Sequence, residues 1–203
     1  MREQPPKWSE QVKKGVLLAG LPVVGTAILS ALYLKTVREV FLTLAITFGT
    51  TSYHVVMRLL VGLVFGVVMQ NNADYKKHRY QVGRHEMAFY EKLNIKDWKR
   101  RMPTYDHTLF DPRVHTWEEI AQAMCQAELI HETIVLLSFL PIAEGIWFGA
   151  YPVFVVTSVL AAGCDTLFVM LQRYNRQRIM KLLEHRNVPT NQSLLPLDSH
   201  VTS

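Results

Sequence analysis

The sequence predicts an all-α integral membrane protein, a bundle of four transmembrane helices with an amphipathic interfacial helical segment between the second and the third. Three observations support this fold class. Three apolar runs are long enough to cross a bilayer, which takes about 20 residues. A fourth segment has a helical pattern but contains titratable residues. The basic residues gather where four spans would place them on one side of the membrane.

Three of the expected spans are apolar runs with almost no formal charge. The first covers residues 15–34, which contain no charged residue. The second covers residues 40–69, where Arg58 is the one formal charge. The last covers residues 148–172, where the one formal charge is Asp165. Each run therefore has the length and composition of a membrane helix.

The third expected span covers residues 120–140. It is interrupted by Glu128, His131 and Glu132. Hydropathy alone scores this segment poorly, and we include it because four spans give a consistent topology. A charged residue at the middle of a span costs ~2.5–3.5 kcal/mol on insertion scales, so such residues tend to face partners or a polar cavity. The interruption therefore indicates an intramembrane reaction or binding centre.

The distribution of charge predicts the orientation. Of the 22 Lys and Arg residues, four lie in residues 1–14, ten in residues 71–117 and five in residues 173–203. By the positive-inside rule, we expect a multi-pass protein of the cell membrane with both termini in the cytoplasm. The net charge of +5 then reflects contact with anionic lipid headgroups. We expect no nucleic-acid partner, because no recognisable nucleic-acid module accompanies the charge.

The stretch between the second and third spans, residues 71–118, is expected to lie at the cytoplasmic interface. Residues 85–93 have an amphipathic helical pattern, and a basic segment around Trp98 follows until Pro103 stops it. The tail, residues 187–203, is expected to be disordered. We therefore expect one membrane domain over the whole chain.

Glu128 and His131 are the leading candidates for catalytic residues. They are three residues apart, so they share one face of a helix. A carboxylate beside an imidazole fixes its tautomer and raises its basicity, as in a general base. The structural alternative is a polar seam that joins two helices.

The Glu-x-x-His spacing is also that of a ligand pair in di-iron bundles. That design needs a second Glu-x-x-His, and no other expected span contains one. We therefore expect no metal site and no cofactor. A metal-dependent lipid-modifying enzyme stays as an alternative, with His54, Glu128, His131 and a nearby carboxylate as ligands.

His54 and Arg58 are four residues apart and also share a helix face. His54 is a third candidate catalytic residue. Arg58 is a candidate substrate-binding residue, because a guanidinium binds a phosphate or carboxylate with two hydrogen bonds. Alternatively, Arg58 neutralises an intramembrane carboxylate such as Glu132 or Asp165.

A mixed polar and basic block follows the last span. A plain flanking sequence needs only charge, whereas this block also contains Gln, Tyr and Asn. It would suit the phosphates of an activated acyl donor, such as a coenzyme A thioester. Besides Arg58, the candidate substrate-binding residues are Trp98, Lys99, Glu132, Gln172, Arg173, Tyr174, Asn175, Arg176 and Arg178.

Three blocks follow one another along the chain, with a span between the second and the third. They are FYEKLNIKDWK at 89–99, AELIH at 127–131 and QRYNRQR at 172–178. In this order the chain resembles the glycosyl-4,4'-diaponeurosporenoate acyltransferase family of small bacterial membrane proteins. The resemblance implies transfer of a fatty acid onto the sugar of a glycosylated carotenoid. It covers residues 89–186, about half of the chain.

The chain departs from the family pattern at two positions. Gln177 stands where the family has Pro, and Glu132 stands where Trp often follows the His. The segment with His54 and Arg58 also lies outside the part that aligns. These departures could mean a different acceptor, or different chemistry on the same scaffold.

The leading hypothesis is a membrane-embedded acyltransferase. It would move a fatty-acyl group to a hydroxyl of a lipid-linked acceptor, a glycosylated isoprenoid or glycolipid, at the cytoplasmic side. His131 would take the hydroxyl proton and Glu128 would hold the imidazole. The last basic block, with Lys99, would bind the donor's phosphates or stabilise developing negative charge. The non-enzymatic alternative is a membrane scaffold or lipid-binding protein.

Overall fold

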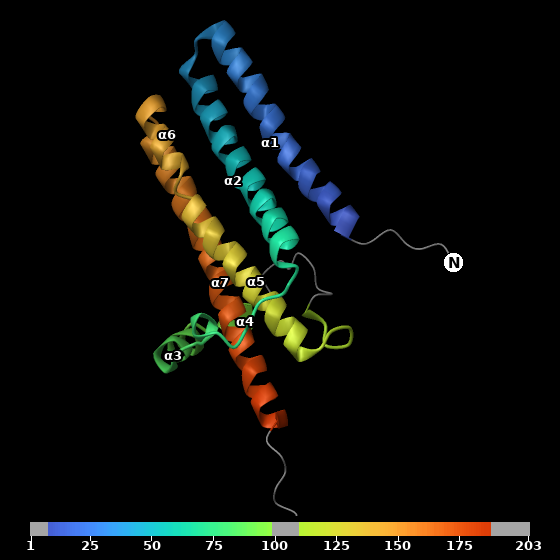
Figure 1. Cartoon of the computed structure of the whole chain (residues 1–203). Coiled ribbons are helices and arrows are strands. Elements are labelled where there is room, and N and C mark those ends of the chain that lie inside the picture. Colours follow the sequence, from blue (N-terminus) through green and yellow to red (C-terminus); the bar gives the residue numbers. More distant parts are fainter. Residues whose placement is uncertain (1–7, 99–109, 188–203) are drawn as a thin grey trace, which may run out of the picture.

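The computed structural model describes residues 8–98 and 110–187, and the secondary structure within these ranges is helical (Figure 1). This confirms the predicted all-α fold. Of the predicted tail, the residues after Asn187 lie outside the described ranges, as does part of the interfacial segment. The elements are α1 (Trp8–Thr36), α2 (Glu39–Met69), the 3₁₀ helix η1 (His78–Tyr80), α3 (Arg84–Lys92), α4 (Ile95–Trp98), α5 (Trp117–Leu137), α6 (Pro141–Phe148) and α7 (Tyr151–Asn187).

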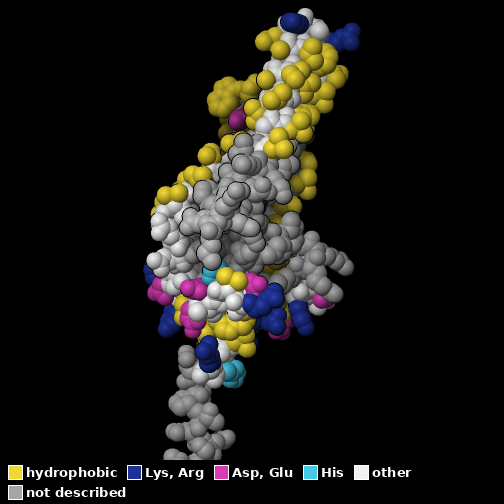
Figure 2. All heavy atoms as spheres, turned by 90° about the vertical axis from the view of Figure 1, so that its right-hand side faces the viewer, with side chains coloured by type: hydrophobic (Ala, Val, Ile, Leu, Met, Phe, Trp, Pro, Cys, Tyr) yellow, Lys and Arg dark blue, Asp and Glu magenta, His cyan; other side chains and the backbone are white. Residues whose placement is uncertain are grey.

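Four helical segments are long and apolar enough to cross a membrane. They are Ala19–Thr36, Glu39–Met69, Trp117–Phe148 and Tyr151–Arg186. Figure 2 shows hydrophobic side chains over the upper part of the visible face, with most of the charged side chains gathered in the lower part. An apolar outer surface of this kind suits lipid, and the protein is a multi-pass membrane protein.

The third span differs from its prediction at its end. The connection expected after residue 140 is the helix α6, which begins at Pro141, ends at Phe148 and is capped by Gly149. Proline suits a first helical position because its fixed φ is helical and its missing N–H would have no partner there. Gly149 has a φ of +66°, which glycine adopts at no steric cost. The apolar segment thus continues as helix almost to the start of α7.

α2 connects two helix pairs. α1 packs on α2, whereas α5 and α6 pack on α7, and α2 contacts both α5 and α7 (Figure 1). The short connections after α1 and α6 lie at the same end of the bundle. The long connection before α5 lies at the other end, which we call the connection end. Consequently α2 and α7 run in the same direction and α5 runs against them.

α7 is longer than a bilayer is thick. Its 37 residues span about 55 Å at 1.5 Å per residue, against about 30 Å for a hydrocarbon core. The helix was expected to leave the membrane near residue 172, and it continues without a break to Asn187. α3 and α4 pack against this lower part of α7. α7 therefore carries residues both inside the span and at the interface.

The start of α5 is fixed by Thr116. Its hydroxyl accepts a hydrogen bond from the Glu119 backbone N–H at 3.2 Å, and the Glu119 carboxylate accepts from the Thr116 N–H at 2.8 Å. This reciprocal pair satisfies two N–H groups that otherwise lack partners at a helix start. Thr116→Ala should lower the free energy of unfolding by about 1 kcal/mol. Thermal denaturation in detergent measures it, with exposed Val114→Ala as control; equal effects in the two variants would contradict the role of the cap.

Candidate functional site

Polar residues of α2, α3, α5 and α7 form two clusters. The mid-span cluster consists of His54, Arg58, His131 and Asp165. The interface cluster consists of Glu86, Glu128, Arg173 and Arg176. Asp165 and Arg173 are eight residues apart on α7, so the two clusters are separated by about 12 Å along the bundle. The interface cluster lies nearer the connection end.

Asp165 is the centre of the mid-span cluster. Its side chain is 4% exposed, and one carboxylate oxygen lies 2.9 Å from Nδ1 of His131. The other oxygen accepts a hydrogen bond from Nη2 of Arg58. Arg58 also donates to the backbone oxygens of His54, at 3.1 Å, and of Ala161, at 3.4 Å. Arg58 therefore supplies the positive charge that a buried carboxylate needs.

The His131 ring is held on two sides. Nδ1 faces Asp165, and the ring stacks on Phe168 with the centroids 4.8 Å apart and the planes 8° from parallel. A carboxylate at Nδ1 assigns the proton to that nitrogen and leaves the lone pair on Nε2. No group among residues 8–98 and 110–187 forms a hydrogen bond with Nε2, and the side chain is 22% exposed. This arrangement can accept a proton from a substrate hydroxyl.

The predicted pairing of Glu128 with His131 is wrong, because Glu128 has other partners. Its side chain is fully buried, and its oxygens accept hydrogen bonds from Nη1 of Arg173, at 2.6 Å, and from Nη1 of Arg176. A buried carboxylate is stabilised by cations, which a neutral imidazole cannot replace. The carboxylate that orients His131 is Asp165. Its sequence signal was a lone acid within a span, which the prediction treated as a possible partner of Arg58.

The Arg58–Asp165 pair confirms one of the two alternatives for Arg58. The predicted contact of Arg58 with a substrate phosphate is untested. His54 lies on the same face of α2 and is buried, but it forms no side-chain hydrogen bond with the other described residues. The structure thus brings His131, Asp165 and Arg58 into direct contact and leaves the catalytic role predicted for His54 untested.

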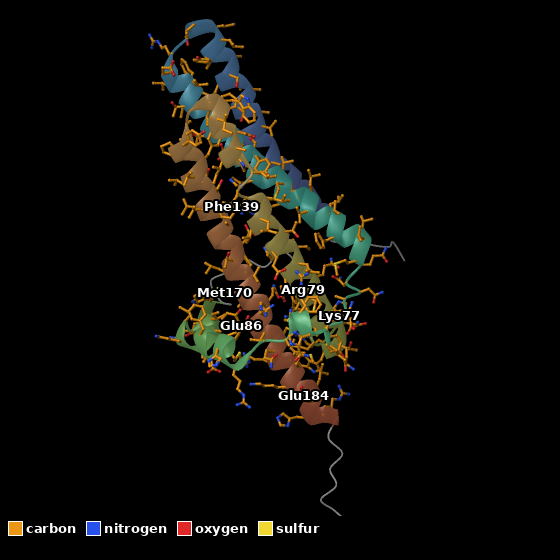
Figure 3. All side chains as sticks on the ribbon, turned by 60° about the vertical axis from the view of Figure 1, so that its left-hand side comes forward. Lys77, Arg79, Glu86, Phe139, Met170 and Glu184 are labelled. Atoms are coloured by element: carbon orange, nitrogen blue, oxygen red, sulfur yellow. The ribbon has the colours of Figure 1, made fainter. Side chains whose placement is uncertain are left out.

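The interface cluster fixes the connection between α2 and α5 onto α7. Arg176 is 1% exposed, donates to the Tyr80 backbone oxygen at 2.7 Å and lies 5.1 Å from the centroid of the Tyr80 ring. Arg173 donates to Glu86 of α3 at 2.6 Å and 3.1 Å. Figure 3 labels Glu86 on α3, next to α7. Two carboxylates and two guanidinium groups balance one another in charge.

These contacts disagree with the predicted role of Arg173 and Arg176 in binding a donor phosphate. Both guanidinium groups are taken up by protein acceptors, and Arg176 is out of reach of any ligand in this arrangement. Tyr174 is also buried, in an apolar cluster with Tyr90 and Ile95. Its predicted substrate contact is therefore not supported, and the block serves chiefly to anchor α3 and α5 on α7.

The other predicted substrate-binding residues are more accessible. Arg178 is exposed and lies over the Tyr174 ring at 5.9 Å, and Trp98 packs against the same apolar cluster. Gln172 and Asn175 are half-buried, and their side chains make no hydrogen bond within the described chain. Lys99 lies outside the described residues.

Glu132, the residue after His131, pairs with Arg79 of η1. The side chains of Glu132 and Arg79 are 33% and 59% exposed, so this ion pair is open to solvent or headgroups. Figure 3 labels Arg79 beside α5. Sequence reasoning missed Arg79, because nothing in the local pattern distinguishes it from the other basic residues of the connection.

The contact between α3 and α7 is expected to depend on pH. Burial alone would raise the pKa of Glu86, but hydrogen bonds from Arg173 and Tyr90 outweigh it and hold the pKa below its ordinary value of 4.5. A carboxyl with a lowered pKa adds stability that is complete above its unfolded-state pKa and is lost as the pH falls through the folded-state pKa. We therefore expect α3 to stay docked at neutral pH and to detach as the pH falls below 4.5.

Spin labels at exposed Ala88 and Lys181 would report this detachment as an increased distance between α3 and α7. Glu86→Gln should show the larger distance already at neutral pH and little further change on acidification. An unchanged distance in the wild type well below pH 4.5 would contradict the expectation.

A membrane bundle with an imidazole–carboxylate pair inside a span has the features of an enzyme that acts on lipids. A family model of glycosyl-4,4'-diaponeurosporenoate acyltransferases matches residues 71–185, more than half of the chain. The chain belongs to this family, which confirms the resemblance found in the sequence. The matched region contains His131, Asp165 and the whole interface cluster, but not His54 and Arg58.

No curated protein and no solved structure matches the chain. Within the described residues, no group of three or more His, Cys, Asp or Glu side chains is placed to hold a metal ion. Membership of the family implies an acyltransferase that acts on a glycosylated carotenoid.

Proposed function

We propose that the protein transfers a fatty-acyl group to a sugar hydroxyl of a glycosylated carotenoid or a related lipid-linked acceptor. The observation that supports this proposal most directly is the His131–Asp165 pair, with Nε2 of His131 open, inside a membrane span. The family name supplies the class of acceptor. Both substrates have long apolar parts that dissolve in the bilayer, so a site within the span is accessible to them from the lipid.

In the proposed reaction, Nε2 of His131 takes the proton of the acceptor hydroxyl. The hydroxyl oxygen attacks the carbonyl carbon of an activated acyl donor and forms a tetrahedral intermediate. This intermediate expels the donor's leaving group, a thiolate if the donor is a thioester, and the leaving group takes the proton from Nε2. Asp165 holds the ring and stabilises the transient imidazolium, and Arg58 balances the charge of Asp165.

We propose that the charged part of the donor approaches from the connection end. Arg79 is exposed there, and its partner Glu132 directly follows His131 in α5. A donor phosphate could replace Glu132 as the partner of Arg79. An acyl coenzyme A carries such phosphates, so it is the co-substrate that this arrangement favours.

We also propose that the connection end faces the cytoplasm. The C-terminal end of α7 and the connection lie at this end of the bundle. Most of the Lys and Arg residues precede α1, lie in the connection or follow residue 172. The positive-inside rule then places both termini in the cytoplasm.

The proposal is tested with purified protein in liposomes that contain a glucosylated carotenoid carboxylate and an acyl coenzyme A. Mass spectrometry should find the glycoside with one added acyl group for the wild type and none for His131→Ala at a matched protein level. A product that gains one oxygen, lost with a chelator, would support the metal-dependent alternative. Normal acylation by His131→Ala would overturn the role of His131. A wild type that acylates nothing, together with a loss of folded protein in His131→Ala, would favour the scaffold.

A further inference from the structure

His54 is a buried histidine whose ring has no hydrogen-bond partner. Its residue is 6% exposed, and neither Nδ1 nor Nε2 bonds to any group in the described part of the chain. The ring meets Tyr53 edge-on, with the centroids 5.4 Å apart. A neutral imidazole has one donor and one acceptor, and burying both without a hydrogen-bond partner in an apolar bundle costs free energy.

Ser158 of α7 is in the same situation. It is fully buried, and its hydroxyl has no partner among the described residues. Other buried serines in these helices behave differently, because Ser52 and Ser138 donate to the carbonyl four residues earlier at 2.8 Å. A buried helical serine commonly makes this bond to its own helix, yet the Ser158 hydroxyl does not.

The register of α2 against α7 brings these two residues to the same level. Thr50 and Phe154, each four residues earlier, line one 190 Å³ cavity. On the other side, Arg58 lies four residues after His54 and donates to the backbone oxygen of Ala161, three residues after Ser158. Because α2 and α7 run in the same direction, His54 and Ser158 lie between these two contacts, about one helical turn from each.

We propose that His54 and Ser158 form a binding site for a hydroxyl group between α2 and α7, about one helical turn before the contact of Arg58 with the Ala161 backbone oxygen. The imidazole and the serine each offer a donor and an acceptor, and a hydroxyl that both donates and accepts satisfies groups on both helices. The group is either an internal water or a hydroxyl of the acceptor's sugar. The second possibility rests on the proposed function, and the first does not.

The first arm of the test uses the protein without substrate. If a bound water links the two side chains, Ser158→Ala should lower the melting temperature in detergent by a few degrees relative to Ser138→Ala. Ser138 is the matched control, because it is equally buried but bonds to its own helix. The double variant His54→Leu/Ser158→Ala should then have a melting temperature only slightly below that of Ser158→Ala, because the effects of substituting two residues that share one ligand are not additive.

The second arm adds a glucosylated carotenoid carboxylate. If the site holds the acceptor's hydroxyl, Ser158→Ala should leave the melting temperature of the free protein unchanged but abolish the rise that the glycoside causes in the wild type. The proposal is overturned if Ser158→Ala melts no lower than Ser138→Ala and the glycoside gives it the same shift, or lack of shift, as the wild type. If the glycoside does not change the melting temperature of the wild type, this counts against the proposed function. The binding site is then tested by the first arm alone.

Discussion

Asp165→Asn should lower the rate of acyl transfer by roughly 10²–10⁴-fold, the range that general acid–base catalysis contributes. The amide keeps the shape of the side chain but has no charge to stabilise an imidazolium at His131. Its NH₂ group can also donate to Nδ1, which would leave the proton on Nε2 and remove the base. His131→Gln should lose at least as much.

Turnover measured at a matched protein level, with kcat and KM determined separately, checks this prediction. Asp165 acts through His131, so we expect the loss in kcat with little change in KM for the acceptor. Cys164→Ser, an exposed neighbour on α7, is the control and should keep full activity. A variant Asp165→Asn with wild-type kcat would remove Asp165 from the mechanism.

Glu128→Leu should destabilise the protein by about 3–5 kcal/mol, because it leaves Arg176 buried without a carboxylate. Arg176→Leu should also destabilise it, though less, because Glu128 keeps its bond to Arg173. The double variant Glu128→Leu/Arg176→Leu should be more stable than Glu128→Leu alone, since Arg173 and Glu86 then form a balanced pair.

Chemical denaturation in detergent measures these three variants as a double-mutant cycle. Activity per folded molecule should change little in Glu128→Leu, which separates a structural role from the catalytic role first predicted for Glu128. If the double variant lost the sum of the two single effects, the two side chains would not be coupled and the assignment of the cluster would be wrong.

The fold was largely predictable, because crossing a bilayer requires long apolar helices and the sequence contains long apolar runs with few charges. The four long apolar helices, the short helices between the second and the third, and the family resemblance are confirmed. The helical connection α6 was not predicted. A short apolar segment between two spans does not by itself indicate whether it continues the helix.

The site was predictable only in part. Periodicity placed Glu128 and His131 on one helix face, and this is correct as geometry. It could not show that their partners come from α7, because the choice between neighbours on one helix and residues on another depends on how the helices pack. Burial decided the outcome: the fully buried Glu128 pairs with two guanidinium groups, whereas the less buried His131 pairs with Asp165.

The unbroken length of α7 has a consequence for kinetics. One rigid helix carries Asp165 about 12 Å from Arg173, so the proposed reaction centre lies deeper in the bilayer than the interface cluster. Substrates with apolar tails then reach it by lateral diffusion within the bilayer. The rate will follow their mole fraction in the lipid surface rather than their concentration in the bulk solution. Adding inert lipid at a constant amount of substrate should slow the enzyme, as surface dilution slows any reaction confined to two dimensions.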